Sequence, residues 1–139
     1  MDRVVNILLV EDDNIDIIDV KRTLEKMHIL NNMTVAKNGE DALHILSEKR
    51  RQSEGIPDIA LVDINMPKMN GLEFLSALRK MDEWKDLKCF IITTSDEKVD
   101  RMAAKQLGIS GYIVKPLKLN NPSSMDAFNL MIDLMNFKK

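Results

Sequence analysis

The run Ile7-Leu8-Leu9-Val10 is apolar at every position and leads directly into three acids, Glu11-Asp12-Asp13. A strand with one face in water alternates apolar and polar residues, whereas a strand inside a parallel sheet is buried on both faces and is apolar throughout. The run therefore predicts an interior strand of a parallel sheet, with the three acids at its carboxyl end.

Outward from this strand, short apolar runs alternate with longer amphipathic stretches along the whole chain. Together with Val5–Val10 they predict five strands, the others being Met33–Ala36, Ile59–Val62, Cys89–Thr93 and Tyr112–Val114. The stretches between the runs have apolar residues at helical spacing, as in Ile17, Val20, Leu24 and Met27. This alternation predicts an α/β fold, a doubly wound five-stranded parallel sheet of flavodoxin-like order 2-1-3-4-5 with helices on both faces.

Further helices are expected from about Gly39 to Arg51, after Asn70-Gly71, and at two positions marked by capping signals. Thr94 is followed three residues later by Glu97, which matches a capping box. Asn121-Pro122 combines an N-cap residue with a proline that the first turn of a helix tolerates.

The last helix has two apolar flanks. One stripe consists of Met125, Phe128, Ile132 and Met135, and a second flank beside it consists of Leu130, Leu134 and Phe137. An apolar surface wider than one sheet face needs is typical of a partner or dimer contact.

Size, charge and cysteine content exclude several classes of protein. The chain has 139 residues, 45% of them apolar, which suits a single domain over residues 1–139 with no output domain. A formal charge of -2 is not that of a nucleic-acid-binding protein. The lone Cys89 suits a reducing compartment. Because the chain has no basic leader, and no uncharged run near the roughly 18 residues that span a bilayer, we expect a cytoplasmic protein without membrane contact.

Polar residues follow four of the predicted strands, and the carboxyl ends of parallel strands meet at one edge of a sheet, where ligands bind. These residues are Glu11-Asp12-Asp13, Asp63-Ile64-Asn65, Thr93-Thr94-Ser95 and Lys115-Pro116. Clustered carboxylates repel one another unless a proton or a cation lies between them, and Mg²⁺ prefers such oxygen ligands. With the ammonium of Lys115 and the hydroxyl of Thr93 nearby, the pattern predicts a magnesium-assisted phosphoryl site with a carboxylate as the possible nucleophile.

At these positions the sequence resembles the receiver domain of bacterial two-component response regulators over nearly the whole chain. Asp63 lies thirty residues before Thr93, which lies twenty-two residues before Lys115. The segment from Asp63 to Gly71 resembles the phosphorylation loop of that family. The match is specific because five elements occur in the order of the family. They are an acidic pair after the first strand, an Asp after the third strand, the loop that follows it, a Thr after the fourth strand and Lys-Pro after the fifth.

The resemblance implies a role for each acid. Asp63 matches the residue that accepts a phosphoryl group from a histidine kinase. Glu11 and Asp12 match the acidic pair that binds Mg²⁺ together with Asp63, and the backbone carbonyl of Asn65 matches a further ligand. Alignment rather than physics chooses the pair among the three consecutive acids, and it leaves Asp13 out.

The resemblance also implies a switch. Thr93 and Lys115 match the pair that contacts the phosphoryl group, and Tyr112 matches an aromatic side chain that moves inward when Thr93 moves. A half-buried aromatic that only packs at a sheet edge is the alternative for Tyr112. The Lys115-Pro116 bond is expected to be cis, as it usually is in the family.

These expectations describe a stand-alone receiver that catalyses only its own phosphotransfer and dephosphorylation. Its signal would be a changed surface of helix 4, strand 5 and helix 5, read by a downstream protein or used in a homodimer. The long connection before Asp58 and the extended last helix resemble response regulators paired with phytochrome-type histidine kinases.

The sequence leaves three alternatives open. A receiver-shaped adaptor would bind partners without phosphorylation. A small Mg²⁺-dependent phosphatase of the haloacid dehalogenase type would need a second acid where this chain has Asn65. A flavodoxin-like nucleotide binder would need a glycine-rich phosphate loop, and the five glycines form none.

Overall fold

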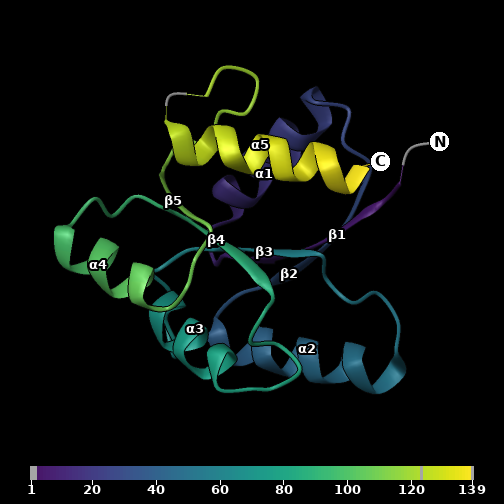
Figure 1. Ribbon diagram of the computed structural model, residues 1–139, viewed down its shortest axis with the longest axis vertical. Helices are drawn as coiled ribbons and strands as arrows, with labels where there is room; N and C mark the ends of the chain where they lie inside the picture. Colours follow the sequence, from purple (N-terminus) through teal and green to yellow (C-terminus); the bar gives the residue numbers. More distant parts are fainter. Residues whose placement is uncertain (1–2, 123, 139) are drawn as a thin grey trace.

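The computed structural model describes residues 3–122 and 124–138, in which strands and helices alternate (Figure 1). The elements are β1 (Val5–Val10), α1 (Asn14–Lys26), β2 (Asn31–Ala36), α2 (Gly39–Gln52), β3 (Ile59–Val62), α3 (Gly71–Arg79), β4 (Lys88–Thr93), α4 (Lys98–Gln106), β5 (Gly111–Val114) and α5 (Met125–Lys138).

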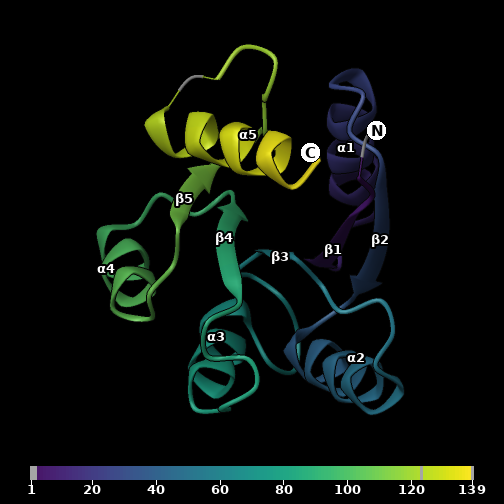
Figure 2. The same cartoon turned by 45° about the vertical axis from the view of Figure 1, so that its right-hand side comes forward.

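The five strands form one parallel sheet in the order β2-β1-β3-β4-β5, which confirms the predicted fold. Helices α1 and α5 cover one face, and α2, α3 and α4 cover the other (Figures 1 and 2). Along β1, Ile7 and Leu9 pack with the core under α1 and α5, while Leu8 and Val10 pack with the core on the opposite face. Burial on both faces is the reason why this strand is apolar throughout.

Two helix starts differ from the prediction. Helix α4 begins at Lys98 rather than Thr94, and its N-cap residue Glu97 makes no side-chain capping hydrogen bond. The hydroxyl of Ser95 donates to Asp100 at 2.6 Å, so the polar residues before α4 order the preceding loop instead of capping the helix.

Helix α5 begins at Met125 rather than at Asn121-Pro122. The hydroxyl oxygen of Ser124 accepts a hydrogen bond from the backbone N–H of Ala127 at 3.1 Å, as an N-cap residue does. The prediction was wrong here because an N-cap residue before proline also occurs in ordinary turns.

The structure decides which apolar side of α5 is buried. Ala127, Leu130 and Leu134 are buried, whereas Met125, Phe128 and Ile132 are exposed. Both stripes have helical spacing, so periodicity alone could not choose between them. A tertiary contact marks the inner side: the carboxylate of Asp126 accepts a hydrogen bond from the backbone N–H of Tyr112 in β5 at 2.8 Å.

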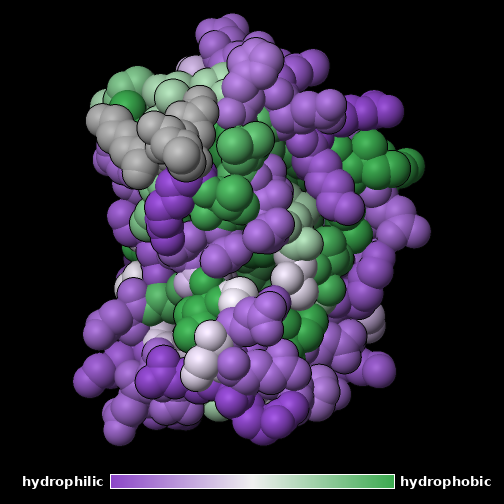
Figure 3. Space-filling view, turned by 90° about the vertical axis from the view of Figure 1, so that its right-hand side faces the viewer, coloured by the Kyte–Doolittle hydropathy of each residue, from purple (hydrophilic) through white to green (hydrophobic). Residues whose placement is uncertain are grey.

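Seen from the side on which both termini lie, hydrophilic side chains cover most of the surface and apolar ones appear between them in separate groups (Figure 3). Among the helices of residues 3–122 and 124–138, none combines the length and apolar character needed to cross a membrane.

Candidate functional site

The carboxyl ends of four strands meet at one edge of the sheet and bring the predicted polar residues together. Sheet hydrogen bonds set their positions, because the N–H of Asp63 donates to the carbonyl of Val10 at 2.9 Å and the N–H of Lys115 donates to the carbonyl of Thr93 at 2.8 Å. Backbone hydrogen bonds between strands therefore bring these residues close together, although they lie far apart in the sequence.

An acidic cup lies at this edge, formed by Glu11, Asp12 and Asp63. Each offers one carboxylate oxygen, and the three oxygens lie within 4.8 Å of one another. Glu11 and Asp63 are buried, and Asp12 is exposed. Within the described part of the chain, Oδ1 of Asp63 is buried without a hydrogen-bond partner. A buried oxygen without a partner is costly, and three carboxylate oxygens are ligands that suit a hard divalent cation.

Asp13, the third of the consecutive acids, has a different position. Its carboxylate caps α1 by accepting a hydrogen bond from the backbone N–H of Asp16 at 3.0 Å. The geometry therefore gives Asp13 a structural contact outside the acidic cup.

The ammonium of Lys115 lies beside the cup and contacts three carboxylates. Its Nζ atom is 2.7 Å from Oε1 of Glu11, 2.6 Å from Oδ2 of Asp16 and 3.5 Å from Oδ2 of Asp63. Asp16 was not among the residues predicted for the site. An acid in the first turn of a helix is common because it interacts favourably with the helix dipole, so nothing in the sequence singles it out.

Burial and neighbouring charges shift the pKa values of Glu11 and Lys115. Burial raises the pKa of Glu11 to about 7, the Asp63 carboxylate adds to the rise, and the hydrogen bond from Lys115 opposes it. Burial lowers the pKa of Lys115, but its hydrogen bonds to Asp16 and Glu11 and the charge of Asp63 outweigh that effect and raise it above its ordinary value. Lys115 therefore stays charged, and its single positive charge faces several acids.

Thr93 and Tyr112 both contact the loop that follows β4. Thr93 is fully buried, and its hydroxyl oxygen accepts a hydrogen bond from the backbone N–H of Ser95 at 3.3 Å. Tyr112 is 3% exposed and donates its hydroxyl hydrogen to the carbonyl of Ser95 at 2.8 Å. Burial raises the pKa of this phenol. The Arg101 guanidinium lies 4.7 Å from the centre of the tyrosine ring and pairs with Asp96.

The loop after β3 passes close to the backbone of Asp63. Asn65 is exposed there, two residues beyond Asp63. The N–H of Gly71 donates to the carbonyl of Ile64 at 3.0 Å, and a Cβ atom at position 71 would lie 2.1 Å from the carbonyl oxygen of Asp63. Only glycine allows this approach. The Lys115-Pro116 bond is cis, as expected.

A comparison with protein-family models matches residues 7–124 to the response regulator receiver domain. The chain belongs to this family. Its fold also matches solved structures. A two-component response regulator from Legionella pneumophila is 36% identical with a TM-score of 0.78, covering 95% of this chain and 98% of that one. The bacteriophytochrome response regulator AtBRR is 28% identical with a TM-score of 0.78, covering 99% and 96%.

A structure described as the Mn²⁺-bound form of response regulator Rcp1 is 26% identical to this receiver with a TM-score of 0.71, covering 94% of this chain and 91% of that one. Among curated proteins, protein PilH of Pseudomonas aeruginosa is 30% identical over 80% of this chain and 85% of its own length. The sensor histidine kinase CheAY of Helicobacter pylori is 34% identical over 79% of this chain. The receiver matches only 13% of the length of CheAY.

Proposed function

We propose that this receiver accepts a phosphoryl group on Asp63 from a sensor histidine kinase in a reaction that depends on Mg²⁺. The observation that carries the proposal is Oδ1 of Asp63, a buried carboxylate oxygen without a hydrogen-bond partner in the described residues. It lies next to Glu11 and Asp12 and close to the ammonium of Lys115. An unpartnered carboxylate is free to act as a nucleophile.

The donor set of the acidic cup fits a hard cation, and the relative Rcp1 has a Mn²⁺-bound form. Glu11, Asp12, Asp63 and the backbone carbonyl of Asn65 would hold Mg²⁺, which supplies charge neutralisation for an incoming phosphoryl group. An Asp63 oxygen attacks phosphorus, and the bond from phosphorus to the nitrogen of the donor histidine breaks.

Two further residues act on the phosphoryl group once it is attached. The group adds about 1.5 to 2 negative charges, which the Lys115 ammonium stabilises and the Thr93 hydroxyl contacts by hydrogen bonding. Movement of Thr93 toward the phosphoryl group alters the loop at Ser95, which both Thr93 and Tyr112 contact. Such a switch is a population shift, so the unphosphorylated protein samples the active form as well.

The output surface in this proposal is formed by α4, β5 and α5. It has exposed apolar side chains on both helices, namely Val99, Met102, Met125, Phe128 and Ile132. Exposed apolar side chains are typical of contact surfaces. We assign this surface to a downstream protein or to a second copy of the chain.

Residues 1–139 would act as a single receiver in the cytoplasm, catalysing only its own phosphorylation and dephosphorylation. The matches that cover 98% of the Legionella pneumophila regulator and 96% of AtBRR support a receiver of this length. The likeness to AtBRR also favours a phytochrome-type histidine kinase as the phosphodonor.

Acetyl phosphate treatment with Mg²⁺, followed by intact-mass measurement, tests the proposal. The wild type should gain the mass of one phosphoryl group and Asp63→Asn none. Asp82→Asn, which alters an exposed acid outside the acidic cup, is the matched control and should react like the wild type. Equal phosphorylation of Asp63→Asn and the wild type would overturn the assignment. Sustained turnover of generic phosphate esters would favour the phosphatase, and partner binding unchanged in Asp63→Ala would favour the adaptor.

A further inference from the structure

Asp16 is the acid closest to the Lys115 ammonium, although it lies outside the acidic cup. Its Oδ2 atom is 2.6 Å from Nζ, against 2.7 Å for Glu11 and 3.5 Å for Asp63. The side chain of Lys115 is only 11% exposed, so the lysine is confined to this edge of the sheet.

The three carboxylates around Lys115 differ in what else they are needed for. Glu11 and Asp63 offer oxygens to the acidic cup, whereas Asp16 does not belong to that group. An ammonium that pairs with Glu11 or Asp63 competes with a cation for the charge of that carboxylate. Of the three carboxylates that contact Lys115, only Asp16 can hold the ammonium without that cost.

We propose that Asp16 is a positioning residue, which draws the Lys115 ammonium to within 2.6 Å of its own carboxylate and keeps it 3.5 Å from Asp63, so that Asp63 stays available as acceptor and cation ligand. This inference rests on the proposed function of Asp63. It adds a fourth acid to the site, one that acts through Lys115.

The position of Asp16 is set by the start of α1. Its backbone N–H is bound by the capping carboxylate of Asp13 at 3.0 Å. The next residue, Ile17, is buried in the core under α1 and α5. The Asp16 carboxylate is therefore presented from a fixed first helical turn. The long lysine side chain adapts to it, because four rotatable bonds allow the ammonium to move.

The variant Asp16→Asn keeps the size of the side chain and removes its charge. We expect the ammonium to shift onto Asp63, where it competes with the cation. Mg²⁺ affinity should fall about tenfold, at the lower end of the losses that follow when a residue outside the ligand set of a metal site is changed. The control Asp19→Asn makes the same charge change on an exposed residue of α1 and should leave the dissociation constant within about twofold of wild type.

The experiment combines two readouts on the intact chain that do not depend on phosphorylation. Calorimetric titration with Mg²⁺ gives the dissociation constants. In the metal-free protein, ¹H–¹⁵N spectra of lysine ammonium groups report the surroundings of Lys115, whose signal is identified by its loss in Lys115→Ala. In Asp16→Asn that signal should shift, and in Asp19→Asn it should not. Matching far-UV circular dichroism spectra establish that both variants are folded.

Two outcomes would overturn the proposal. One is an unchanged Mg²⁺ dissociation constant in Asp16→Asn. The other is weaker binding with an unmoved Lys115 signal, which would mean that only the general loss of negative charge matters. If the wild type fails to take up a phosphoryl group from acetyl phosphate, the proposed function fails by itself. The calorimetric and spectroscopic results still decide the role of Asp16 in that case.

Discussion

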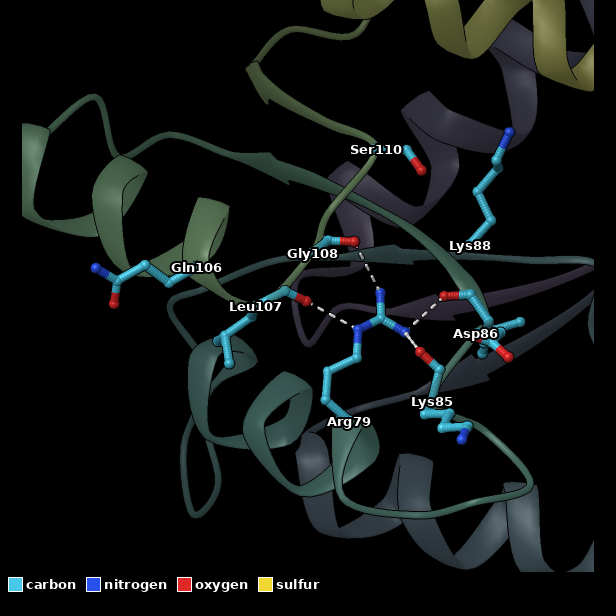
Figure 4. A pocket seen from close by; sticks show the side chains of 9 residues that line it. Arg79, Lys85, Asp86, Lys88, Gln106, Leu107, Gly108 and Ser110 are labelled. Carbon is cyan, nitrogen blue, oxygen red and sulfur yellow. Dashed lines mark hydrogen bonds between the residues drawn. The ribbon is translucent and has the colours of Figure 1, made fainter.

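Lys115 and Arg79 each contact oxygen atoms from distant segments. Lys115 lies where the strands end, and Arg79 lies on the other side of the sheet, where β4 and β5 begin. Lys115, just after β5, contacts two carboxylates that directly follow β1 and β3 and a third from α1. Arg79, at the end of α3, lies in a pocket of about 460 Å³ beside the loops that precede β4 and β5 (Figure 4). It donates to the carbonyls of Leu107 and Leu87, both at 2.8 Å, and to those of Lys85 and Gly108.

The difference lies in the charge of the acceptors. The oxygens around Arg79 are neutral carbonyls, and the guanidinium donates a hydrogen bond to each of them. This arrangement, named the Arg79 clamp, leaves no excess negative charge on these acceptors. The acceptors around Lys115 are carboxylates whose combined charge exceeds that of one ammonium, which leaves the site able to take a further cation. The contacts of Arg79 therefore contribute to stability, whereas the carboxylates around Lys115 fit the proposed phosphoryl site.

The largest expected effect is on stability at the Arg79 clamp. Arg79→Ala leaves four carbonyls without their donor and should lower the free energy of unfolding by about 2 to 4 kcal/mol, as measured by urea unfolding. Arg79→Lys should restore only part of this loss, because an ammonium has fewer donors and no planar fork. The control Arg22→Ala, at an exposed position on α1, should change it by less than about 0.5 kcal/mol. A loss below about 1 kcal/mol for Arg79→Ala would contradict the clamp.

Alanine substitutions of Gly71, near Asp63, and of Gly108, near Arg79, should lower the free energy of unfolding by different amounts in urea unfolding. Gly71→Ala places a Cβ atom 2.1 Å from the backbone oxygen of Asp63, which no side-chain movement relieves, so we expect a loss of about 2 to 3 kcal/mol. Gly108 has φ +68, and its added Cβ would meet only Arg79 at 3.9 Å. Gly108→Ala should therefore cost only the backbone strain of about 1 kcal/mol. Equal losses for the two variants would mean that the approach at Gly71 can be relieved.

Added Mg²⁺ should stabilise variants of Lys115 and of Arg79 to different extents. Removal of the ammonium in Lys115→Ala ends its competition for the acidic cup, so added Mg²⁺ should stabilise this variant more than the wild type. A tenfold tighter site would add about 1.4 kcal/mol to the Mg²⁺-dependent stabilisation. Arg79→Ala should gain from Mg²⁺ as much as the wild type does. Urea unfolding with and without MgCl₂ measures both, and an equal gain for Lys115→Ala and the wild type would refute the competition.

The smallest effect concerns the thiol next to the Arg79 clamp. Burial raises the pKa of Cys89 from 9.0 to about 11. Between these values the folded protein binds more protons than the unfolded chain, so its stability falls as pH rises. Relative to Cys89→Ala, the wild type should lose about 1 kcal/mol between pH 8 and pH 10 in urea unfolding. A pH-independent difference would mean that water reaches the thiol.

Local sequence pattern determined the strands and therefore the edge at which the site lies. Each apolar run ends at a polar residue, and parallel strands align their ends, so Asp63, Thr93 and Lys115 had to come close together. The family match and the sheet order agree with what these runs predict.

Tertiary structure alone decided which partners the long side chains reach and which side of α5 is buried. Two stripes of α5 have the same period, and contacts made in the folded chain mark the inner side, among them those of Asp126 with Tyr112 and of Asp133 with Lys88. Nothing local distinguishes Arg79 or Asp16 from other charged residues on helices. Their roles depend on loops and strands that come close only in the folded chain, because ion pairs and hydrogen bonds form between neighbours in space.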